Sequence, residues 1–354
     1  MDNLFYFVVP LAISFVSTPL LSSIAKKNGI TDNPGLHKTH HEPKPLLGGL
    51  SIFLAVVIGS LCLLPVTARL FSGLVGAAIL AITGLLDDVY NLKPHYKMAG
   101  QAAAASVVVL YNREAYGVLV NYFERFYLPE ALTLALIIGW IVLMVNAFNL
   151  IDGLDGLAIG TAVIIAGALT AVSVINGAGG RQLAVQLICL GAFLGFLPYN
   201  FNPARIFLGD TGSMLLGYLL ASLHLFAITE PFSSSLVLGS AFIFAFPAVD
   251  VTYAICRRLK NRRSIFGADQ GHIHHLLRRL GLSVRRAVLL LYAVSIFCAA
   301  LAVFLLSAAV HPAYVLALGI IISLGFCWLI LLLNRRLRSV ETPGGSSPEL
   351  RRTV

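Results

Sequence analysis

The stretch Asn146-Ala-Phe-Asn-Leu-Ile-Asp152-Gly-Leu-Asp155-Gly-Leu-Ala158 lies between two long apolar runs, residues 131–145 and 157–175. Asp152 and Asp155 are three positions apart, so a helical backbone would place both carboxylates on one face. Each acid is followed by a glycine, whose lack of a side chain lets a backbone or a phosphate approach closely. A plain turn between two membrane helices needs only one glycine or asparagine, whereas acids at the mouth of a span are costly. The stretch therefore predicts a functional site.

The composition is that of a membrane protein. The chain has 354 residues, of which 58% are hydrophobic and 12% are charged, and its mean hydropathy is +0.86. Its apolar runs are continuous over about 17 to 25 residues, which predicts helices that cross the bilayer and excludes the alternating strands of a β-barrel. We therefore predict an all-α polytopic membrane protein. The first run has no basic segment before it and no cleavage site after it, so we interpret it as a retained span.

Eleven apolar segments are predicted to span the membrane within one integral-membrane domain, residues 1–334. Residues 335–354 carry Pro, Gly, Ser and charge and are predicted to form a flexible cytoplasmic tail. Pro247 lies inside the ninth segment and should kink it, which could open a lateral groove for a lipid chain. The predicted spans are residues 4–25, 46–64, 70–86, 97–111, 131–147, 157–175, 183–200, 212–229, 234–256, 287–308 and 313–334.

The distribution of basic residues predicts the orientation. Counted from the N-terminus, the odd-numbered connections and the tail together carry 21 Lys and Arg, and the other connections carry four. Cytoplasmic loops hold the excess of Lys and Arg in membrane proteins. This bias predicts a cytoplasmic C-terminus and an N-terminus outside the cell.

Five acids abut apolar runs on the predicted cytoplasmic side: Asp87, Asp88, Asp152, Asp155 and Asp210. An acid at mid-membrane costs about 3 kcal/mol on insertion scales, so a mere scaffold has no reason to carry five of them near the bilayer. Oxygen ligands without thiolates suit a hard cation, Mg²⁺ or Mn²⁺, which completes its shell with water and substrate phosphates. Asp87 and Asp88 lie about 100° apart on a helix and should have different roles. Distant segments that converge on one face predict an active site at the ends of a helix bundle.

A histidine cluster, His272-Ile-His274-His275, falls on the same side. His272 and His275 would share one face of a short helix, where imidazoles can donate to a phosphate or act as acid–base groups. A zinc site is the alternative, although the cluster lacks a fourth soft ligand nearby. For His274 alone, a solvated basic loop is an equally good interpretation.

Other residue classes narrow the function further. The five cysteines lie within or at the ends of apolar runs, without CxxC spacing, so we predict no disulfide framework and no cysteine metal site. The arginines between residues 257 and 286 can attract an anionic substrate or anionic lipid. No soluble surface interleaves aromatic residues with this charge, which argues against nucleic-acid binding.

Asp210 precedes an apolar segment, so we expect it at a helix N-terminus, where the dipole and free N–H groups favour phosphate. Phe207 could stack on a base, although packing against the next helix is the alternative. Asp250 lies near the cytoplasmic end of the ninth segment. It either hydrogen-bonds across the bundle or belongs to the site.

Taken together, these motifs resemble those of the polyprenyl-phosphate N-acetylhexosamine-1-phosphate transferases. The resemblance spans roughly residues 30–282 and includes Asp87-Asp88-x-x-Asn91, Asn149-x-x-Asp152-Gly-x-Asp155-Gly-Leu-Ala, Gly209-Asp210-Thr-Gly-Ser and His272-Ile-His274-His275. The last motif is similar to that of the WecA/TagO branch. MraY-type members carry three His followed by an acid, which is absent here and argues against a MurNAc-pentapeptide substrate.

The resemblance implies a reaction in which undecaprenyl phosphate attacks the β-phosphorus of a UDP-N-acetylhexosamine, with UDP-GlcNAc as the expected donor. UMP leaves, and a polyprenyl diphospho-sugar forms; we favour direct attack over an enzyme-bound intermediate. The resemblance implies that Mg²⁺, or Mn²⁺, is held by Asp210 and Asp152. The implied catalytic residues are Asp87, Asp88, Asp152 and Asp155. The implied substrate-binding residues are Lys44, Asn91, Asn149, Arg205, Phe207, His272, His274 and His275.

The same resemblance places the enzyme in a bacterial cytoplasmic (inner) membrane, with its active site on the cytoplasmic face. Its product would initiate a cell-envelope polysaccharide such as lipopolysaccharide O-antigen or teichoic acid, and homodimerisation stays open. Another UDP-sugar, such as FucNAc or QuiNAc, is the first alternative. A transporter or Mg²⁺ channel is a weaker one, because such proteins place acids near the midplane and often show inverted repeats. A catalytically inactive scaffold would not need every motif intact.

Overall fold

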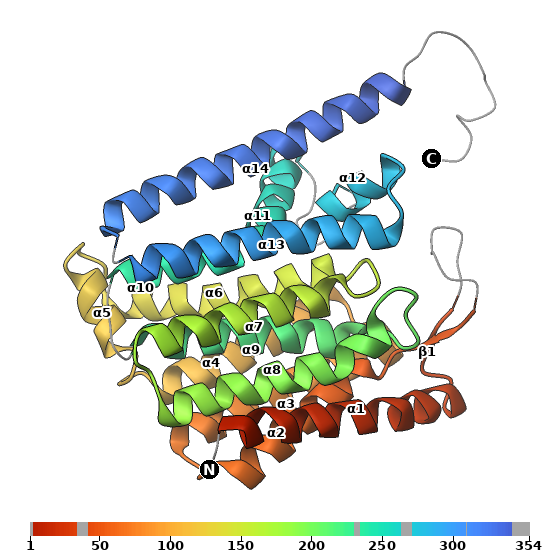
Figure 1. Ribbon diagram of the computed structural model, residues 1–354, viewed down its shortest axis with the longest axis horizontal. Coiled ribbons are helices and arrows are strands. Elements are labelled where there is room, and N and C mark those ends of the chain that lie inside the picture. Colours follow the sequence, from red (N-terminus) through yellow and green to blue (C-terminus); the bar gives the residue numbers. More distant parts are fainter. Residues whose placement is uncertain (1–2, 34–41, 230–233, 263–270, 309, 342–354) are drawn as a thin grey trace.

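The computed structural model describes residues 3–33, 42–229, 234–262, 271–308 and 310–341. Almost all of this part is helical, as the apolar runs predict (Figure 1). A two-stranded antiparallel hairpin, β1 (Thr31–Asp32) with β2 (Lys44–Pro45), is its one sheet. The helices are α1 Asn3–Lys27, α2 Gly48–Leu63, α3 Ala68–Tyr90, α4 Pro94–Tyr111, α5 Gly117–Glu124, α6 Glu130–Ile151, α7 Leu157–Ile175, α8 Gly180–Asn200, α9 Gly209–Thr229, α10 Ser234–Ala241, η1 Phe242–Phe244 (a 3₁₀ turn), α11 Ala245–Lys260, α12 Ile273–Arg279, α13 Val284–Ser307 and α14 Pro312–Glu341.

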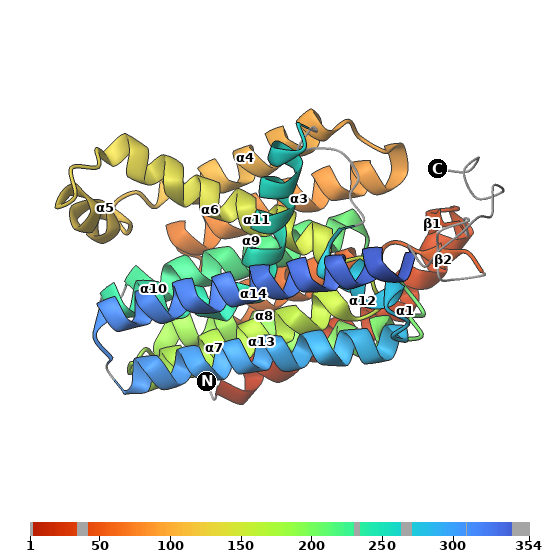
Figure 2. The same cartoon turned by 90° about the horizontal axis from the view of Figure 1, so that it is seen from above.

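The bundle is built around α9. Nearly all of its apolar length is buried, and it packs against α2, α3, α6, α7 and α8. The outermost helix, α14, is mostly exposed, as expected for a helix whose surroundings are lipid. The hairpin and α12 lie at one end of the bundle and α5 lies at the other (Figures 1 and 2). We call these the hairpin end and the far end.

Each of the eleven predicted spans falls on a helix or, for the ninth, on α10–α11. Within the described residues, nine helical stretches have the length and composition to cross a membrane. The predicted second span, α2, has only 16 residues, and the alanine-rich α4 is not among the nine. The count of eleven and the orientation therefore stay predictions.

The kink predicted at Pro247 is confirmed. The ninth span is divided into α10, the 3₁₀ turn η1 and α11, and the turn immediately precedes the first residues of α11. Pro247 has no N–H to donate to the carbonyl four residues earlier, so a regular helix cannot continue through this point. As a result α11 crosses the bundle steeply, whereas α10 runs along α13 (Figure 1).

Two segments differ from the sequence prediction. The connection at residues 112–130 contains a helix, α5, which forms because Leu119 and Val120 are buried against the bundle. At the other end of the chain, α14 continues to Glu341, seven residues beyond the predicted span. No helix breaker occurs there before Pro343, so the helix extends into the segment that we predicted to be a flexible tail. The rest of that segment, residues 342–354, lies outside the described residues.

At the hairpin end, glycines bring three helices into backbone contact. A Cβ on Gly49 of α2 would lie 2.1 Å from the backbone nitrogen of Gly212 in α9. A Cβ on Gly84 of α3 would lie 2.3 Å from the Cα of Thr211. Real side chains do not tolerate such distances, so the first turn of α9 is held between α2 and α3 only because these positions lack side chains.

We expect Gly84→Ala to destabilise the protein by about 1–3 kcal/mol, because the added methyl group must push the backbone of α9 away. Gly73→Ala is the matched control: it lies in the same helix, and a Cβ there would meet nothing within 4 Å. Thermal unfolding of the detergent-solubilised variants measures the difference. Equal unfolding temperatures for the two variants would contradict the close contact between α3 and α9.

Candidate active site

Acids and other polar residues from distant segments meet around a cavity of about 480 Å³ at the hairpin end. We call it the acidic cavity. It brings together six of the predicted site residues from the ends of α3, α6, α9 and α12 and the segments between them. Its lining includes Asp32, Leu46, Asp88, Asp152, Asp155, Phe207, Asp210, His275 and Arg278. The convergence expected from the sequence is thus present in the structure.

A lysine bridges two of the acids at the hairpin end. Nζ of Lys97, in α4, lies 2.6 Å from an Oδ of Asp87 and 2.5 Å from an Oδ of Asp210. The other oxygen of Asp210 accepts a hydrogen bond of 2.9 Å from Asn149, which also donates to Ser213. One ammonium group therefore joins α3 and α9, and Asn149 joins α6 to the same carboxylate.

Sequence reasoning missed Lys97 as a site residue and counted it only as a charge that fixes topology. A signal was nevertheless available: Lys97 is the one Asp, Glu, Lys or Arg within Pro94–Tyr111. A single ionisable residue in an otherwise apolar membrane helix is a functional candidate by default, with a partner of opposite charge expected nearby.

Asp88 has a different role from its neighbour, as its direction on the helix predicts. Its two oxygens accept hydrogen bonds from the backbone N–H of Asp210 at 2.7 Å, the backbone N–H of Thr211 at 3.1 Å and the Thr211 hydroxyl at 2.7 Å. Asp88 thus caps α9 from another helix. The N–H groups that we expected to favour a substrate phosphate already have a carboxylate partner, so that expectation is wrong for Asp210 and Thr211.

The expectation that Asp152 and Asp155 share a helical face is also wrong. α6 ends at Ile151, α7 begins at Leu157, and the residues between them form turns. Gly156 adopts φ +82°, a left-handed conformation that interrupts a right-handed helix and that glycine adopts without strain. The two acids consequently have separate surroundings.

Asp155 hydrogen-bonds to the 201–205 segment, whereas Asp152 lines the acidic cavity without such a contact among the described residues. An oxygen of Asp155 accepts hydrogen bonds from the Asn202 side chain at 2.9 Å and the Ala204 N–H at 3.0 Å. Burial raises the pKa of Asp152 well above its usual value, and the nearby carboxylates of Asp210, Asp88 and Asp155 add to this effect. Burial and neighbouring negative charge both disfavour the ionised form of Asp152.

The segment after β2 runs beside the segment that precedes α9. Gly48 and Gly49 donate backbone hydrogen bonds to the carbonyls of Phe207 and Leu208 at 3.1 and 2.8 Å, and Phe207 donates to Pro45 at 2.8 Å. These bonds fix Phe207, whose half-buried ring lines the acidic cavity. A half-buried position is compatible both with stacking on a base and with packing against the next helix, so both interpretations of Phe207 stay predictions.

Of the eight predicted substrate-binding residues, only Phe207 and His275 line the acidic cavity in the described structure. Asn149 contacts Asp210 beside it, and His272 and His274 are buried.

The other three predicted substrate-binding residues lie elsewhere. Lys44 lies in β2, paired with Asp32 across the hairpin. Asn91 is exposed and ends α3 with φ +51°, which an asparagine tolerates better than most residues. Arg205 is exposed, and its backbone N–H donates to Tyr199 at 2.8 Å.

Asp250 organises the histidine segment. One of its oxygens lies 2.8 Å from Nδ1 of His272, and the other accepts the Ile273 N–H at 3.0 Å. Asp250, His272 and Ile273 are all buried. Asp250 therefore makes a hydrogen bond across the bundle, from α11 to the start of α12, and it orients a predicted site residue in doing so.

The shared face expected for His272 and His275 is wrong, because α12 begins only at Ile273 and His272 precedes it in an extended conformation. The buried pair is instead His272 and His274, whose rings are stacked with centroids 5.9 Å apart. Burial, followed by the charge of His275, lowers the pKa of His274 to about 3, so this ring is neutral. His274 is therefore not part of a solvated loop, whereas His275 lines the acidic cavity.

The residues present suit a hard cation better than zinc. No group of three or more His, Cys, Asp and Glu side chains in the described part of the chain is arranged to hold a metal by itself. Mg²⁺ commonly takes only one or two carboxylates and completes its shell with water and substrate phosphates. Asp152 and Asp210 both line the cavity together with Asp32, Asp88 and Asp155, so its acids outnumber its basic residues, His275 and Arg278. The donor set thus fits Mg²⁺ that is shared with a phosphate ligand.

The bundle and its acidic cavity define a multi-pass membrane enzyme whose polar site lies at the ends of its helices. Comparison with known proteins identifies the family. Residues 70–228 match the model of glycosyl transferase family 4. Relatives that are at least 30% identical over most of this chain show that it belongs to the polyprenyl-phosphate N-acetylhexosamine-1-phosphate transferases of that family.

Three relatives illustrate the similarity. A probable undecaprenyl-phosphate N-acetylglucosaminyl 1-phosphate transferase of Bacillus subtilis is 37% identical over 86% of this chain and 85% of its own length. A decaprenyl-phosphate N-acetylglucosaminephosphotransferase of Mycobacterium tuberculosis is 35% identical over 91% and 87%. An undecaprenyl-phosphate alpha-N-acetylglucosaminyl 1-phosphate transferase of Escherichia coli is 27% identical over 92% of both chains.

Proposed function

We propose that this protein transfers N-acetylglucosamine 1-phosphate from UDP-GlcNAc to undecaprenyl phosphate, releasing UMP and forming a polyprenyl diphospho-sugar. The observation that carries the proposal is the similarity over nearly the full length to relatives whose names specify a GlcNAc donor and a polyprenyl phosphate. Those names favour GlcNAc over the other N-acetylhexosamines. Membership of this family also argues against a transporter.

The geometry of the acidic cavity supports this chemistry. Both substrates are anions, so their approach requires positive groups that offset the repulsion between them. His275 and Arg278 also line the cavity and are suited to bind the diphosphate of the donor. Phe207 presents a half-buried ring on which the uracil can stack. One substrate stays in the bilayer, which is consistent with a site at the ends of membrane helices.

The charged residues have different proposed roles: some position other groups, two bind the metal, and two stabilise the surrounding segments. Asp87 pairs with Lys97, which suits it to positioning Lys97 near the lipid phosphate rather than to acting as a free base. Asn149 and Lys97 hold Asp210 in one orientation. We propose that Asp210 and Asp152 hold Mg²⁺, or Mn²⁺, which when bound neutralises the diphosphate and helps UMP to leave. Asp88 and Asp155 keep α9 and the 201–205 segment in place around the site.

We further propose that the hairpin end faces the cytoplasm of a bacterial cell. The supporting observation is the excess of Lys and Arg in the connections at that end and in the tail. A cytoplasmic site would have direct access to a nucleotide sugar. Its lipid-linked product would then serve as the first intermediate of a cell-envelope polysaccharide.

The first experiment is a transfer assay on the purified full-length protein with radiolabelled UDP-GlcNAc, undecaprenyl phosphate and Mg²⁺. We expect label in the organic phase, stoichiometric UMP, and loss of both after chelation with EDTA. Transfer from another UDP-sugar but not from UDP-GlcNAc would keep the reaction and correct the donor. A folded protein that transfers from no UDP-sugar would overturn the proposal.

Asp250→Asn tests whether the orientation of His272 matters. We expect kcat/KM to fall about tenfold or more, because a hydrogen bond that involves a charged group contributes about 1.5–3 kcal/mol. The unfolding temperature should change little, since an asparagine fits the same space. If the variant keeps its activity and loses stability, Asp250 only anchors α12.

A further inference from the structure

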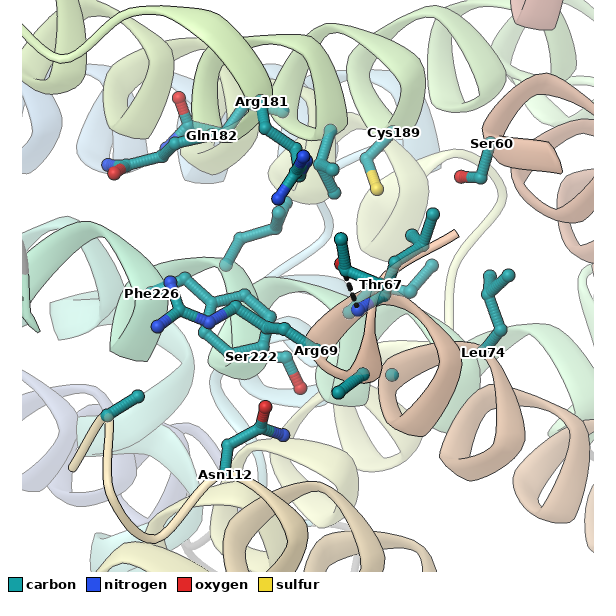
Figure 3. A pocket seen from close by; sticks show the side chains of 18 of the residues that line it. Ser60, Thr67, Arg69, Leu74, Asn112, Arg181, Gln182, Cys189, Ser222 and Phe226 are labelled. Carbon is teal, nitrogen blue, oxygen red and sulfur yellow. Dashed lines mark hydrogen bonds between the residues drawn. The ribbon is translucent and has the colours of Figure 1, made fainter. Parts of the chain in front are cut away.

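A second cavity, of about 870 Å³, lies at the far end of the bundle. It opens between the beginnings of α3 and α8, the end of α4 and the last turns of α9, so none of its lining belongs to the acidic cavity. Figure 3 shows polar side chains around this opening, among them Arg69, Asn112, Arg181 and Gln182. The proposed transferase reaction uses none of these residues.

The second cavity combines two arginines with the N-terminus of α8. The N-terminus of α3 is capped by the Thr67 hydroxyl, which accepts the Leu70 N–H. Arg69 is the second residue of α3 and Arg181 is the second residue of α8, and neither helix has an acid in its first turn. Gly179, which precedes α8, provides no side-chain cap, so the first N–H groups of that helix have no capping side chain. Helix N-termini and guanidinium groups both favour a phosphate. The guanidinium of Arg69 also lies over the ring of Phe226, 5.4 Å from its centroid.

Polar groups other than the arginines also occur in the lining of the cavity. The side-chain carbonyl oxygen of Gln186 is buried and has no hydrogen-bond partner among the described residues, and the same holds for the Ser60 hydroxyl. Both residues line the cavity and are at most 1% exposed. Glu114 adds a carboxylate to the lining. The Glu114 carboxylate is exposed and suits a hydrogen-bond donor on the ligand, whereas the Gln186 and Ser60 oxygens lie below the surface of the cavity.

The remaining lining is apolar and favours a ligand with a hydrocarbon part. Leu74, Val185 and Leu223 contribute side chains to the wall. Tyr111 lines the cavity and is 61% exposed, as expected for an aromatic residue at the membrane–water interface. A free phosphate ion would leave these surfaces without contacts.

We propose that the second cavity binds a phospholipid with an aminated headgroup. The phosphate contacts Arg69, Arg181 and the N-terminus of α8, and the ammonium donates to Glu114. The acyl chains extend along the apolar wall toward the bilayer. This inference does not depend on the proposed transferase activity, because it concerns the opposite end of the helices.

The test is native mass spectrometry of the delipidated full-length protein in detergent, titrated with phosphatidylethanolamine. Arg181 is exposed, so Arg181→Gln should fold normally, and we expect it to weaken binding of the first lipid about tenfold. Arg125→Gln is the matched control: it makes the same charge change at an exposed residue of the far end that does not line the cavity. Size-exclusion profiles verify that both variants are folded.

Two further arms identify the ligand. Phosphatidylcholine, whose headgroup has no N–H donor, should bind more weakly than phosphatidylethanolamine, and Glu114→Gln should reduce this difference. Excess inorganic phosphate should not displace the lipid; complete displacement would make this a site for free phosphate. Equal lipid binding by the wild type, Arg181→Gln and Arg125→Gln would overturn the proposal, as would the absence of binding to the wild type.

Discussion

Asp210→Asn is expected to reduce the rate of GlcNAc-1-phosphate transfer by at least about 10³-fold, the scale of losing one electrostatic contact made to the transition state. Asp210 is the second residue of α9, the most buried of the long apolar helices in the described residues, and its carboxylate contacts both the Lys97 ammonium and the Asn149 amide. Asparagine keeps the shape but removes the charge that would hold Mg²⁺. The measurement is kcat with saturating UDP-GlcNAc over a series of Mg²⁺ concentrations.

Glu124→Gln provides the control for Asp210→Asn. It also replaces an acid with its amide, but at an exposed position at the far end of the bundle. Its activity should match that of the wild type. Wild-type activity of Asp210→Asn at every Mg²⁺ concentration would exclude both a metal-binding and a catalytic role for Asp210.

Lys97→Met should cause the second-largest loss of transferase activity among the substitutions considered. Without the ammonium, the carboxylates of Asp87 and Asp210 face each other without their shared cation. Removing one partner of a buried ion pair costs about 3–5 kcal/mol, and the exposure of Lys97 and Asp210, 22% and 30% of their side chains, reduces that figure. We expect an activity loss of about 10²-fold together with a lower unfolding temperature.

Lys93→Met is the matched control for this substitution, because Lys93 is exposed and lies four residues earlier at the start of α4. It should be close to wild type in both activity and unfolding temperature. The double variant Lys97→Met/Asp210→Asn gives a second check. The stability losses caused by substituting two partners of one ion pair do not add. The double variant should therefore be about as stable as the less stable single variant. Additive losses would mean that the two side chains act separately.

Much of the site could be predicted from local sequence. Charged or polar residues beside apolar runs cost free energy in a membrane, so their presence indicates a function. This argument identifies Asp152, Asp155, Asp210 and His275. The structure places all four around one cavity. The kink at Pro247 was equally predictable, since it depends only on a missing N–H within a helix.

The sequence by itself determined that this chain is a bundle of membrane helices with an acidic site at their ends. Hydropathy and the position of acids beside apolar runs are local properties, so they can be read from neighbouring residues alone. Tertiary structure alone decided what each acid contacts. Asp88 and Asp210 are 122 residues apart, and Lys97 and Asp210 are 113 residues apart. Because α3 and α9 approach closely at Gly84, Asp88 can cap α9. For the same reason its neighbour Asp87 can share the Lys97 ammonium with Asp210. The second cavity arises in the same way, because the beginnings of α3 and α8 meet only when the bundle has packed.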